Sequence, residues 1–258
     1  MLSIIIPTLN EEYIVSDILE CLKKQSFKDF EVILVDGNSN DKTKEIAKKY
    51  LKKLDLKVIN SEIRNVGYQR NLGVNKSKYD TILFLDVDTS FSENFLEKSI
   101  KEFNDHNLKV AGCPLYPDSN NMIDKLFYFL FRNFMFIFYK YIGFNGCCIF
   151  VLKELHNKIN GFDTSIKVGE DYDYSSRLKE YTKLNMLKNV KIKTSTRRFQ
   201  KYGRLRTGLK VVAMGLYVLF VGKIRNDIFK YRFNDNLFYR SVNKKSPFKN
   251  QNNSKLYK

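Results

Sequence analysis

A pair of carboxylates near the middle of the chain could bind a metal ion. The segment 81–88 begins as a short apolar run and ends in Asp86 and Asp88, which is typical of a buried strand of a parallel sheet. Ligands of open α/β sheets bind beyond the carboxyl ends of the strands. Two oxygen donors there suit Mg²⁺ or Mn²⁺ carrying a diphosphate, because few protein ligands leave sites for phosphate oxygens. The alternative is an acidic turn in which Ser90 or Ser92 caps the next helix.

A second acidic cluster could supply a base. Residues 169–173 read Gly-Glu-Asp-Tyr-Asp and precede a helical segment with Leu178 on its apolar side. Acidic side chains at a helix N-terminus interact favourably with the helix dipole, which would account for one or two of them. Three carboxylates within four residues, shortly after the Gly-Phe-Asp of 161–163, favour a functional role. A carboxylate at such a place can accept the proton of an attacking hydroxyl group.

Two other segments could contact a nucleotide. Asp36 follows the apolar run 30–35. Asn40 or Asp41 can cap the next helix, so Asp36 is not needed as its cap. The carboxylate of Asp36 can therefore accept hydrogen bonds from a nucleobase or a ribose. The segment 64–73 predicts a loop that enters a short helix and carries two arginines and two glycines. Backbone N–H groups and guanidinium groups there suit a diphosphate, and an ordinary solvated helix is the alternative.

The elements that carry these residues alternate between strand and helix. Apolar runs predict strands over 2–6, 30–35 and 57–60, and apolar residues at helical spacing predict helices over 11–24 and 42–54. This alternation is typical of the mononucleotide-binding half of a doubly wound α/β sheet. At 258 residues, one large α/β domain is expected rather than two.

The order and spacing of these motifs strongly resemble the GT-A glycosyltransferases of family 2. The matching segments are 5–12, 35–41, 67–73, 85–88, 161–163 and 169–173, followed by Arg177. The resemblance covers roughly residues 2–205. One departure is the Asp-Gly-Asn-Ser of 36–39, where many relatives carry Asp-Asp-Gly-Ser, so that the second carboxylate is missing.

The resemblance implies a Rossmann-like GT-A catalytic domain over 1–205, with a mostly parallel sheet flanked by helices. A C-terminal apolar helix and a basic tail, which could associate with a membrane, are expected in 206–258. The implied enzyme moves a hexose-like sugar from a nucleotide-diphosphate donor to an acceptor hydroxyl or a lipid phosphate. Inversion at the anomeric carbon is expected, because direct displacement needs one base, whereas retaining hydrolases pair a nucleophile with an acid.

The resemblance also assigns roles to single residues. Asp171 would be the catalytic base, with Glu170 positioning the acceptor or its neighbours. Asp88, together with Asp86, would bind the Mn²⁺ or Mg²⁺ ion, which offsets the charge that builds on the leaving diphosphate. The residues expected to bind the nucleotide sugar are Pro7, Thr8, Glu11, Asp36, Ser39, Arg70, Asp86 and Arg198.

The densest basic patch of the chain spans 194–206. Processive relatives carry Gln-x-x-Arg-Trp in the corresponding region, and here only Arg198 and Phe199 match the last pair, with Ser195 at the Gln position. Chain polymerisation is therefore not expected, whereas a contact between Arg198 and the leaving diphosphate is. A solvated basic loop is the alternative.

The net charge and two apolar segments indicate which kinds of partner the protein binds. The formal net charge of +17, from 45 basic and 28 acidic residues, implies an anionic partner. The segments 126–144 and 209–222 are unusually apolar, but both are short of the roughly 20 clean residues of a spanning helix. They suit buried core helices or helices that lie in a membrane interface. We therefore expect a cytoplasmic protein, peripheral at the inner face of the cell membrane, with a polyprenyl-type lipid or a glycan as acceptor.

The rival interpretation is a non-catalytic basic α/β module that binds nucleic acid or another polyanion. Its support is the charge alone, since no zinc-ligand spacing or recognition-helix pattern accompanies it, and nucleic acid is not expected as a partner. The four cysteines lack zinc-like spacing, which favours a reduced intracellular protein. Neither His106 nor His156 is expected to bind metal or act as a base. The N-terminus enters a strand without a basic flank, so no signal peptide is expected.

Overall fold

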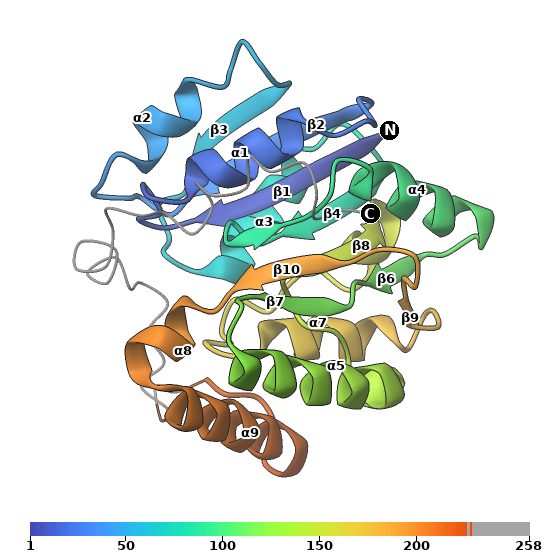
Figure 1. The fold of residues 1–258 in the computed structure, drawn as a ribbon. Helices are drawn as coiled ribbons and strands as arrows, with labels where there is room; N and C mark the ends of the chain where they lie inside the picture. Colours follow the sequence, from blue (N-terminus) through green and yellow to red (C-terminus); the bar gives the residue numbers. More distant parts are fainter. Residues whose placement is uncertain (226–227, 229–258) are drawn as a thin grey trace.

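The structure, a computed structural model, describes residues 1–225 and 228. A large sheet crosses its centre in the strand order β3-β2-β1-β4-β8-β6-β9, and a small sheet has the order β5-β10-β7 (Figure 1). The strands are β1 (Leu2–Thr8), β2 (Phe30–Asp36), β3 (Leu56–Asn60), β4 (Thr81–Leu85), β5 (Thr89–Ser90), β6 (Val110–Gly112), β7 (Leu115–Asp118), β8 (Cys148–Leu152), β9 (Asn185–Met186) and β10 (Ile192–Ser195). The helices are α1 (Val15–Lys23), α2 (Thr43–Lys48), α3 (Val66–Asn75), α4 (Phe95–Asp105), α5 (Met122–Ile142), α6 (Lys153–Lys158), α7 (Glu170–Leu178), α8 (Arg197–Tyr202) and α9 (Arg204–Phe220).

The large sheet is mostly parallel, as the sequence predicts. Strands β1 to β4 run parallel to one another, while β8 is antiparallel to both β4 and β6. The register of β1 and β2 pairs Thr8 with Asp36 at the last position of both strands. Because parallel strands end at the same edge, this pair and the Asp86 that follows β4 gather at one side of the sheet.

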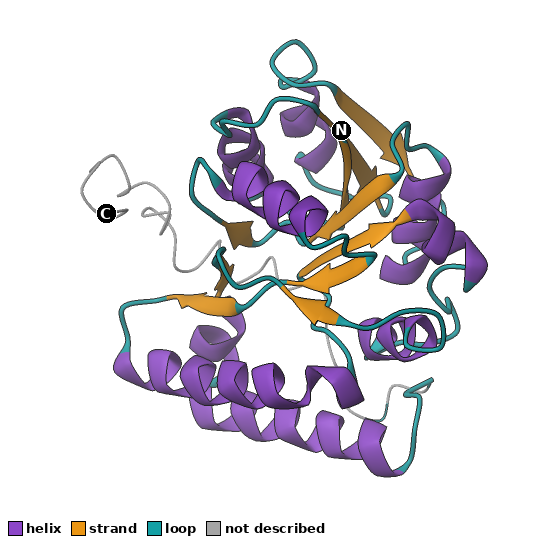
Figure 2. Cartoon of the chain, turned by 90° about the vertical axis from the view of Figure 1, so that its right-hand side faces the viewer, coloured by secondary structure: helices purple, strands orange, loops and turns teal. Residues whose placement is uncertain are grey.

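Two apolar layers cover the two faces of the large sheet, and helices lie over both (Figure 2). Successive side chains of a strand point to opposite faces, so Ile4 and Ile6 belong to the layer that contains α1, whereas Ile5 belongs to the other. Helix α3 packs very closely on β1. A Cβ atom at Gly73 would lie 2.4 Å from the Cγ2 atom of Ile5, so glycine permits this close packing.

Two helices are shorter than the sequence predicts. Helix α1 begins at Val15 instead of residue 11, because Glu11 and Glu12 lie in a turn. The backbone N–H of Glu11 donates to Thr43 Oγ1 at 2.7 Å, and that of Glu12 donates to the Asp41 carboxylate at 3.1 Å. Helix α2 ends at Lys48 instead of residue 54, and the chain continues in hydrogen-bonded turns. Glu11 therefore lies outside α1, and its buried carboxylate accepts hydrogen bonds from Arg197.

The two apolar segments form long helices that pack together at the lower edge of Figure 1. Helix α5 is 21 residues long, and α9 is 17 residues long. The buried Asp124 of α5 accepts a hydrogen bond from the Arg204 guanidinium of α9 at 2.8 Å, which joins their N-terminal ends. Among the described residues, none of the helices combines the length and the apolar character needed to cross a membrane. The basic tail from Lys244 onward lies outside the described residues.

Candidate active site

Asp36 organises the loop that follows β2. Its buried carboxylate accepts hydrogen bonds from the backbone N–H of Ser39 at 2.8 Å and from the Ser39 hydroxyl at 2.5 Å. The hydroxyl of Thr8 lies 3.5 Å from the same carboxylate, and the Lys44 ammonium group lies 3.8 Å from it. The structure therefore brings together four of the residues expected at the donor, because Pro7 precedes Thr8 in β1. Their contacts with a nucleotide remain predictions.

Gln69 holds the ends of β1 and β2 together, a role that the sequence analysis missed. Its buried side-chain amide donates to the carbonyl of Thr8 at 2.9 Å and to the carbonyl of Val35 at 2.7 Å. Helix α3 is thereby fixed to the sheet edge beside Asp36. The available signal was a polar residue inside the segment 67–73, but its strand partners cannot be identified from local sequence.

Arg70 lies at the centre of the site and is only 2 % exposed. Its guanidinium group donates to Glu170 Oε1 at 2.9 Å, to Asp86 Oδ1 at 3.0 Å and to the carbonyl of Gly146 at 3.2 Å. Burial opposes the positive charge, but the carboxylates of Asp86, Glu170 and Asp171 outweigh burial and raise the pKa of Arg70. This arginine therefore joins the end of β4 to the start of α7. Its expected contact with the nucleotide remains a prediction.

Asp171 has the surroundings expected of a base. Its carboxylate accepts hydrogen bonds from the backbone N–H of Gly146 at 2.6 Å and from its neighbour Tyr172 at 2.9 Å. Desolvation and the nearby charge of Glu170 raise the pKa of Asp171 to about 7, against the opposing effect of Arg70. A carboxylate that titrates near neutral pH is well matched to general base catalysis.

Asp86 and Asp88 lie directly after β4, as predicted. Burial raises the pKa of Asp86, Arg70 opposes this shift, and the charge of Asp88 adds to it. The side chain of Asp88 is 15 % exposed. Within the described part of the chain, no group of three His, Cys, Asp or Glu side chains forms a complete metal site. Two carboxylates nevertheless fit Mg²⁺ or Mn²⁺ that takes its other oxygen ligands from a diphosphate and water.

Arg197 connects α8 with the donor side of the site. It forms a bidentate ion pair with Glu11, at 2.7 and 2.8 Å, and its guanidinium group lies 3.6 Å from Asp88 Oδ2. Burial raises the pKa of Glu11, while Arg197 opposes the shift and Asp88 adds to it. The sequence analysis selected the neighbouring Arg198, whose contact with a diphosphate remains a prediction. Both arginines lie in the predicted basic patch, and only the fold distinguishes them.

The loop 161–163 packs against Arg70 and the neighbouring Asn71 of α3. The backbone of Phe162 exchanges two hydrogen bonds with the Asn71 amide, at 2.8 and 2.9 Å, and the Phe162 ring lies 5.1 Å from the Arg70 guanidinium carbon. Phe162 also stacks on Tyr174 at 3.9 Å, and the Tyr174 hydroxyl is 2.9 Å from His156 Nδ1. Burial lowers the pKa of His156 to about 4. This histidine packs behind the site as a neutral side chain.

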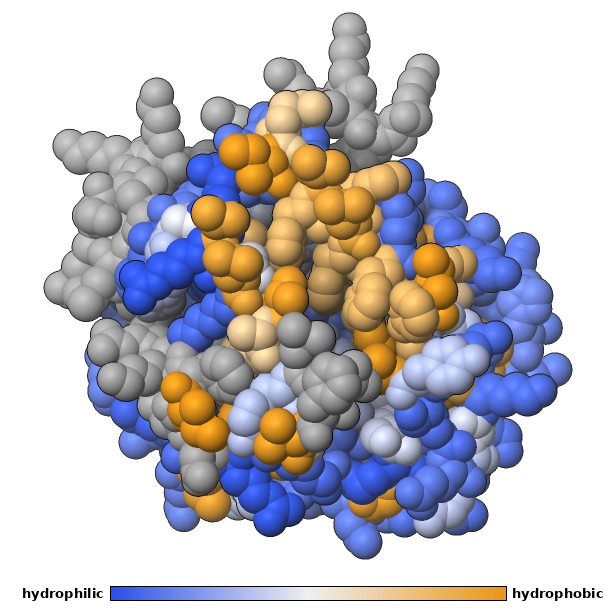
Figure 3. All heavy atoms as spheres, turned by 90° about the horizontal axis from the view of Figure 1, so that it is seen from below, coloured by the Kyte–Doolittle hydropathy of each residue, from blue (hydrophilic) through white to orange (hydrophobic). Residues whose placement is uncertain are grey.

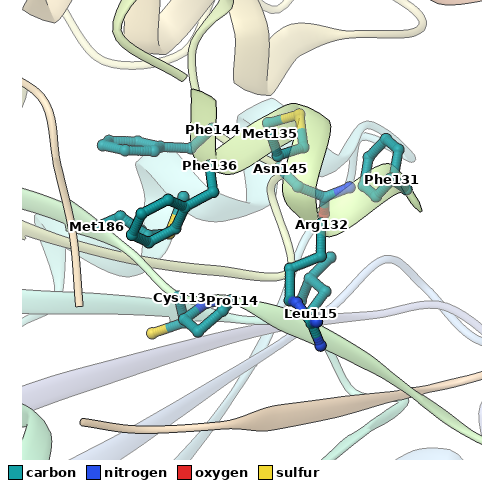
Figure 4. A pocket seen from close by; sticks show the side chains of 11 residues that line it. Cys113, Pro114, Leu115, Phe131, Arg132, Met135, Phe136, Phe144, Asn145 and Met186 are labelled. Carbon is teal, nitrogen blue, oxygen red and sulfur yellow. The ribbon is translucent and has the colours of Figure 1, made fainter. Parts of the chain in front are cut away.

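A small pocket lies between α5 and the strands β6 and β7 (Figure 4). Its lining is mainly apolar, with the Arg132 side chain at one side, and it includes Phe144 and Asn145 immediately before Gly146. The other lining residues are Gly112, Cys113, Pro114, Leu115, Phe131, Met135, Phe136 and Met186. The pocket therefore adjoins the segment that donates a hydrogen bond to Asp171.

The model of the family described as Glycosyl transferase family 2 matches residues 3–159. The chain belongs to this family. The match covers β1 to α6, and therefore includes Arg70, Asp86 and Asp88. Glu170, Asp171 and Arg197 lie after the matched segment.

Several relatives and solved structures resemble this family member. The chain is 34 % identical over 112 residues to the poly(ribitol-phosphate) beta-N-acetylglucosaminyltransferase TarS of Staphylococcus aureus, covering 42 % of this chain and 20 % of TarS. A second relative is the dolichyl N-acetyl-alpha-D-glucosaminyl phosphate 3-beta-D-2,3-diacetamido-2,3-dideoxy-beta-D-glucuronosyltransferase of Methanococcus voltae. The chain is 26 % identical to it over 223 residues, which cover 78 % of this chain and 70 % of that protein. The chain thus spans only about a fifth of TarS.

Two solved structures share the fold. TarS 1–349 in complex with UDP-GlcNAc matches 84 % of this chain and 66 % of its own, with a TM-score of 0.61 at 19 % identity. The mannosyltransferase PcManGT of Pyrobaculum calidifontis, in complex with GDP-Man and Mn²⁺, matches 74 % of this chain and 56 % of its own, with a TM-score of 0.62 at 17 % identity. These similarities establish the GT-A architecture of the chain.

Proposed function

We propose that this protein transfers a sugar from a nucleotide-diphosphate donor to an acceptor hydroxyl or lipid phosphate, with inversion at the anomeric carbon. The observation that carries the proposal is the buried Arg70, which binds Asp86 at the end of β4 and Glu170 at the start of α7. One carboxylate of the proposed metal pair and the first turn of the helix that carries the proposed base are thereby held by one guanidinium group. Transfer from a nucleotide sugar needs both functions.

Asp88 and Asp86 would hold Mg²⁺ or Mn²⁺. The ion would offset the negative charge that develops on the departing nucleoside diphosphate. Arg197 and Arg198 add positive charge on the same side, and Arg197 keeps Glu11 paired. Asp36, Ser39 and Thr8, at the neighbouring strand ends, would shape the nucleotide pocket.

Asp171 would remove the proton of the acceptor hydroxyl through a carboxylate oxygen. Glu170 remains bound to Arg70 and orients the first turn of α7. The site offers one base for direct displacement, which supports inversion. If the acceptor is an ionised lipid phosphate, no proton needs to be removed and Asp171 is not required as a base.

The named relatives support a nucleotide-sugar donor. TarS has been solved with UDP-GlcNAc, and PcManGT with GDP-Man and Mn²⁺. The Methanococcus voltae relative acts on a dolichyl-linked sugar phosphate according to its name, which supports a lipid-linked acceptor here. The name of TarS, a poly(ribitol-phosphate) beta-N-acetylglucosaminyltransferase, supports a polymer hydroxyl as the other possible acceptor.

An exposed apolar surface on α5 and α9 supports attachment to the inner face of the cell membrane (Figure 3). Its exposed side chains are Ile123, Leu126, Leu130, Phe134, Ile137 and Phe138 of α5, with Leu205, Leu209 and Val212 of α9. We call this set the α5–α9 surface. Exposed basic residues, including Lys125, Lys140 and Arg206, accompany it. Apolar side chains beside basic groups suit a helix pair lying on anionic lipid.

A panel of nucleotide sugars tested with Mn²⁺ examines the proposed activity. We expect one donor to be hydrolysed slowly and to raise the melting temperature, and Asp88→Ala to lose turnover and most metal-dependent affinity for the nucleotide. Full activity of Asp88→Ala, or activity indifferent to a chelator, would exclude the metal role. Salt-sensitive binding of nucleic acid without turnover of any donor would favour the rival polyanion-binding function.

A further inference from the structure

After α9 the chain returns to the site and pairs with the loop that precedes α7. Ile224 forms an antiparallel β-bridge with Val168, and its carbonyl accepts a hydrogen bond from the backbone N–H of Lys167 at 2.9 Å. The side chain of Ile224 is only 1 % exposed. This short pairing is therefore a packed contact between two segments of the chain.

Charged side chains strengthen the same contact on both sides of Ile224. The Lys223 ammonium group lies 2.7 Å from Asp173 Oδ1 and 3.5 Å from Asp163 Oδ2. The Arg225 guanidinium group lies 3.6 Å from Asp163 Oδ2. Asp173 is also bound by Arg177 at 2.8 Å and is only 6 % exposed, so its pair with Lys223 is partly shielded from solvent.

The contacted segments immediately flank the proposed base. The loop 163–168 leads into Gly169, whose φ of +82° lets the chain turn sharply into α7. Glu170 and Asp171 follow, and Asp173 lies in the first turn of the helix. Residues 223–225 therefore contact the chain both before and after Asp171.

The helix pair that precedes residues 223–225 also contacts the proposed metal site, through α8. Helix α8, which directly precedes α9, carries the Arg197 that binds Glu11 and lies near Asp88. At the other end of α9, the chain continues through Gly222 to Lys223. The segment 197–225 thus spans from the carboxylates of the proposed metal site to the helix of the proposed base.

We propose that residues 223–225 form a strap that positions Asp171, with Lys223 and Ile224 as positioning residues. The inference rests on the proposed role of Asp171 as base. The strap fixes the turn at Gly169 and the first turn of α7, so that Asp171 keeps its hydrogen bond to Gly146. Part of the segment 206–258, which the sequence assigns to a separate C-terminal region, therefore completes the catalytic domain.

The double variant Lys223→Ala with Ile224→Ser tests the strap. We expect kcat for hydrolysis of the donor selected by the panel to fall by about 10- to 100-fold, because small displacements of a catalytic group cost this much. The affinity for UDP or GDP with Mn²⁺ should stay within about twofold, since Asp86 and Asp88 lie in the loop after β4, which the strap does not contact. Amide hydrogen exchange should accelerate in 163–173 but not in 81–88. Lys223→Arg with Ile224→Val should restore both readouts.

Lys78→Ala is the matched control, because Lys78 also pairs with a carboxylate, that of Asp55 at 3.0 Å. These two residues precede β4 and β3, and therefore lie at the strand ends opposite the site. This variant should leave kcat unchanged. Wild-type kcat in the double variant, or equal losses of kcat and nucleotide affinity, would overturn the strap. Asp171→Asn is measured in parallel, because wild-type turnover in that variant would reject the proposed base instead.

Discussion

At the scale of single residues, one buried cation organises several carboxylates. Arg70 binds Asp86 and Glu170 directly, and its charge also reaches Asp171. Carboxylates this close repel one another unless a cation lies between them. Arg197 has the same role for Glu11 and Asp88. The two arginines therefore offset part of the repulsion among these carboxylates, whose pKa values burial nevertheless raises at Glu11, Asp86 and Asp171.

The pH dependence of turnover tests the environment of Asp171. A base acts as its carboxylate, and desolvation together with Glu170 raises the pKa of Asp171 to about 7. We therefore expect kcat/KM to rise about tenfold per pH unit below pH 7 and to level off above it. Asp171→Asn should lose about 10²- to 10⁴-fold in turnover while still binding the nucleotide.

Glu170→Gln serves as a companion variant. Removal of the charge that raises the pKa of Asp171 should move the inflection of the profile to lower pH. A flat profile from pH 5 to 8 in the wild-type protein, or loss of nucleotide binding in a folded Asp171→Asn protein, would contradict the assignment.

At the scale of elements, the packing of α3 on β1 supports the site, since α3 carries both Gln69 and Arg70. Gly73→Ala would bring a methyl group to 2.4 Å from Ile5, which is buried in the sheet. We expect a loss of about 1–3 kcal/mol in the free energy of unfolding, because overpacking forces the helix outward. Urea denaturation measures it.

Gly215→Ala is the matched control on α9, because among the described residues no atom beyond the helix's own backbone and the adjacent residues lies within 4 Å of the added Cβ. Alanine has the higher helix propensity, so this variant should be neutral or up to about 1 kcal/mol more stable. Equal stability of the two variants would show that α3 does not depend on the close approach at Gly73.

At the scale of the whole molecule, the proposed membrane attachment combines the α5–α9 surface with the net charge of +17. Phe127, Phe131, Phe134 and Phe138 recur at helical spacing, but two of them pack against the protein and two are exposed. Phe127 packs on the buried Phe199, and Phe131 packs against the core, whereas Phe134 and Phe138 are 49 % and 41 % exposed. The outward residues of α5 are therefore the ones to substitute.

Flotation with vesicles containing phosphatidylglycerol tests this surface. Wild-type protein should float at low salt and partly at high salt, because salt screens the contribution of about 1 kcal/mol per basic residue but not the apolar one. Leu130→Glu with Ile137→Glu should release the protein, since these side chains are 58 % and 64 % exposed.

Asn75→Glu with Asn104→Glu adds the same charge at exposed positions on α3 and α4, and should leave flotation largely intact. A wild-type protein that never floats, or equal release of both double variants, would reject membrane attachment through the α5–α9 surface.

The sequence by itself determines the α/β fold, the strand that Asp86 and Asp88 follow, and the helix that begins at Glu170. These features are encoded by local patterns, in which apolar runs of strand length and polar residues at their ends predict the edge of a sheet. The same local rules overextended α1 and α2. Hydrogen bonds to residues far along the chain, such as the one that the backbone N–H of Glu11 donates to Thr43 Oγ1, decided where α1 begins.

Only the tertiary structure decided which charged groups pair. Arg70 meets Glu170, 100 residues away, and Arg197 meets Glu11, 186 residues away. With 45 basic and 28 acidic residues in the chain, the sign of a charge does not select its partner. Burial and direction select it, and both arise when separate elements pack together. The same reason explains why the strap at Lys223 and Ile224 was invisible in a segment whose local pattern indicates only an apolar helix and its end.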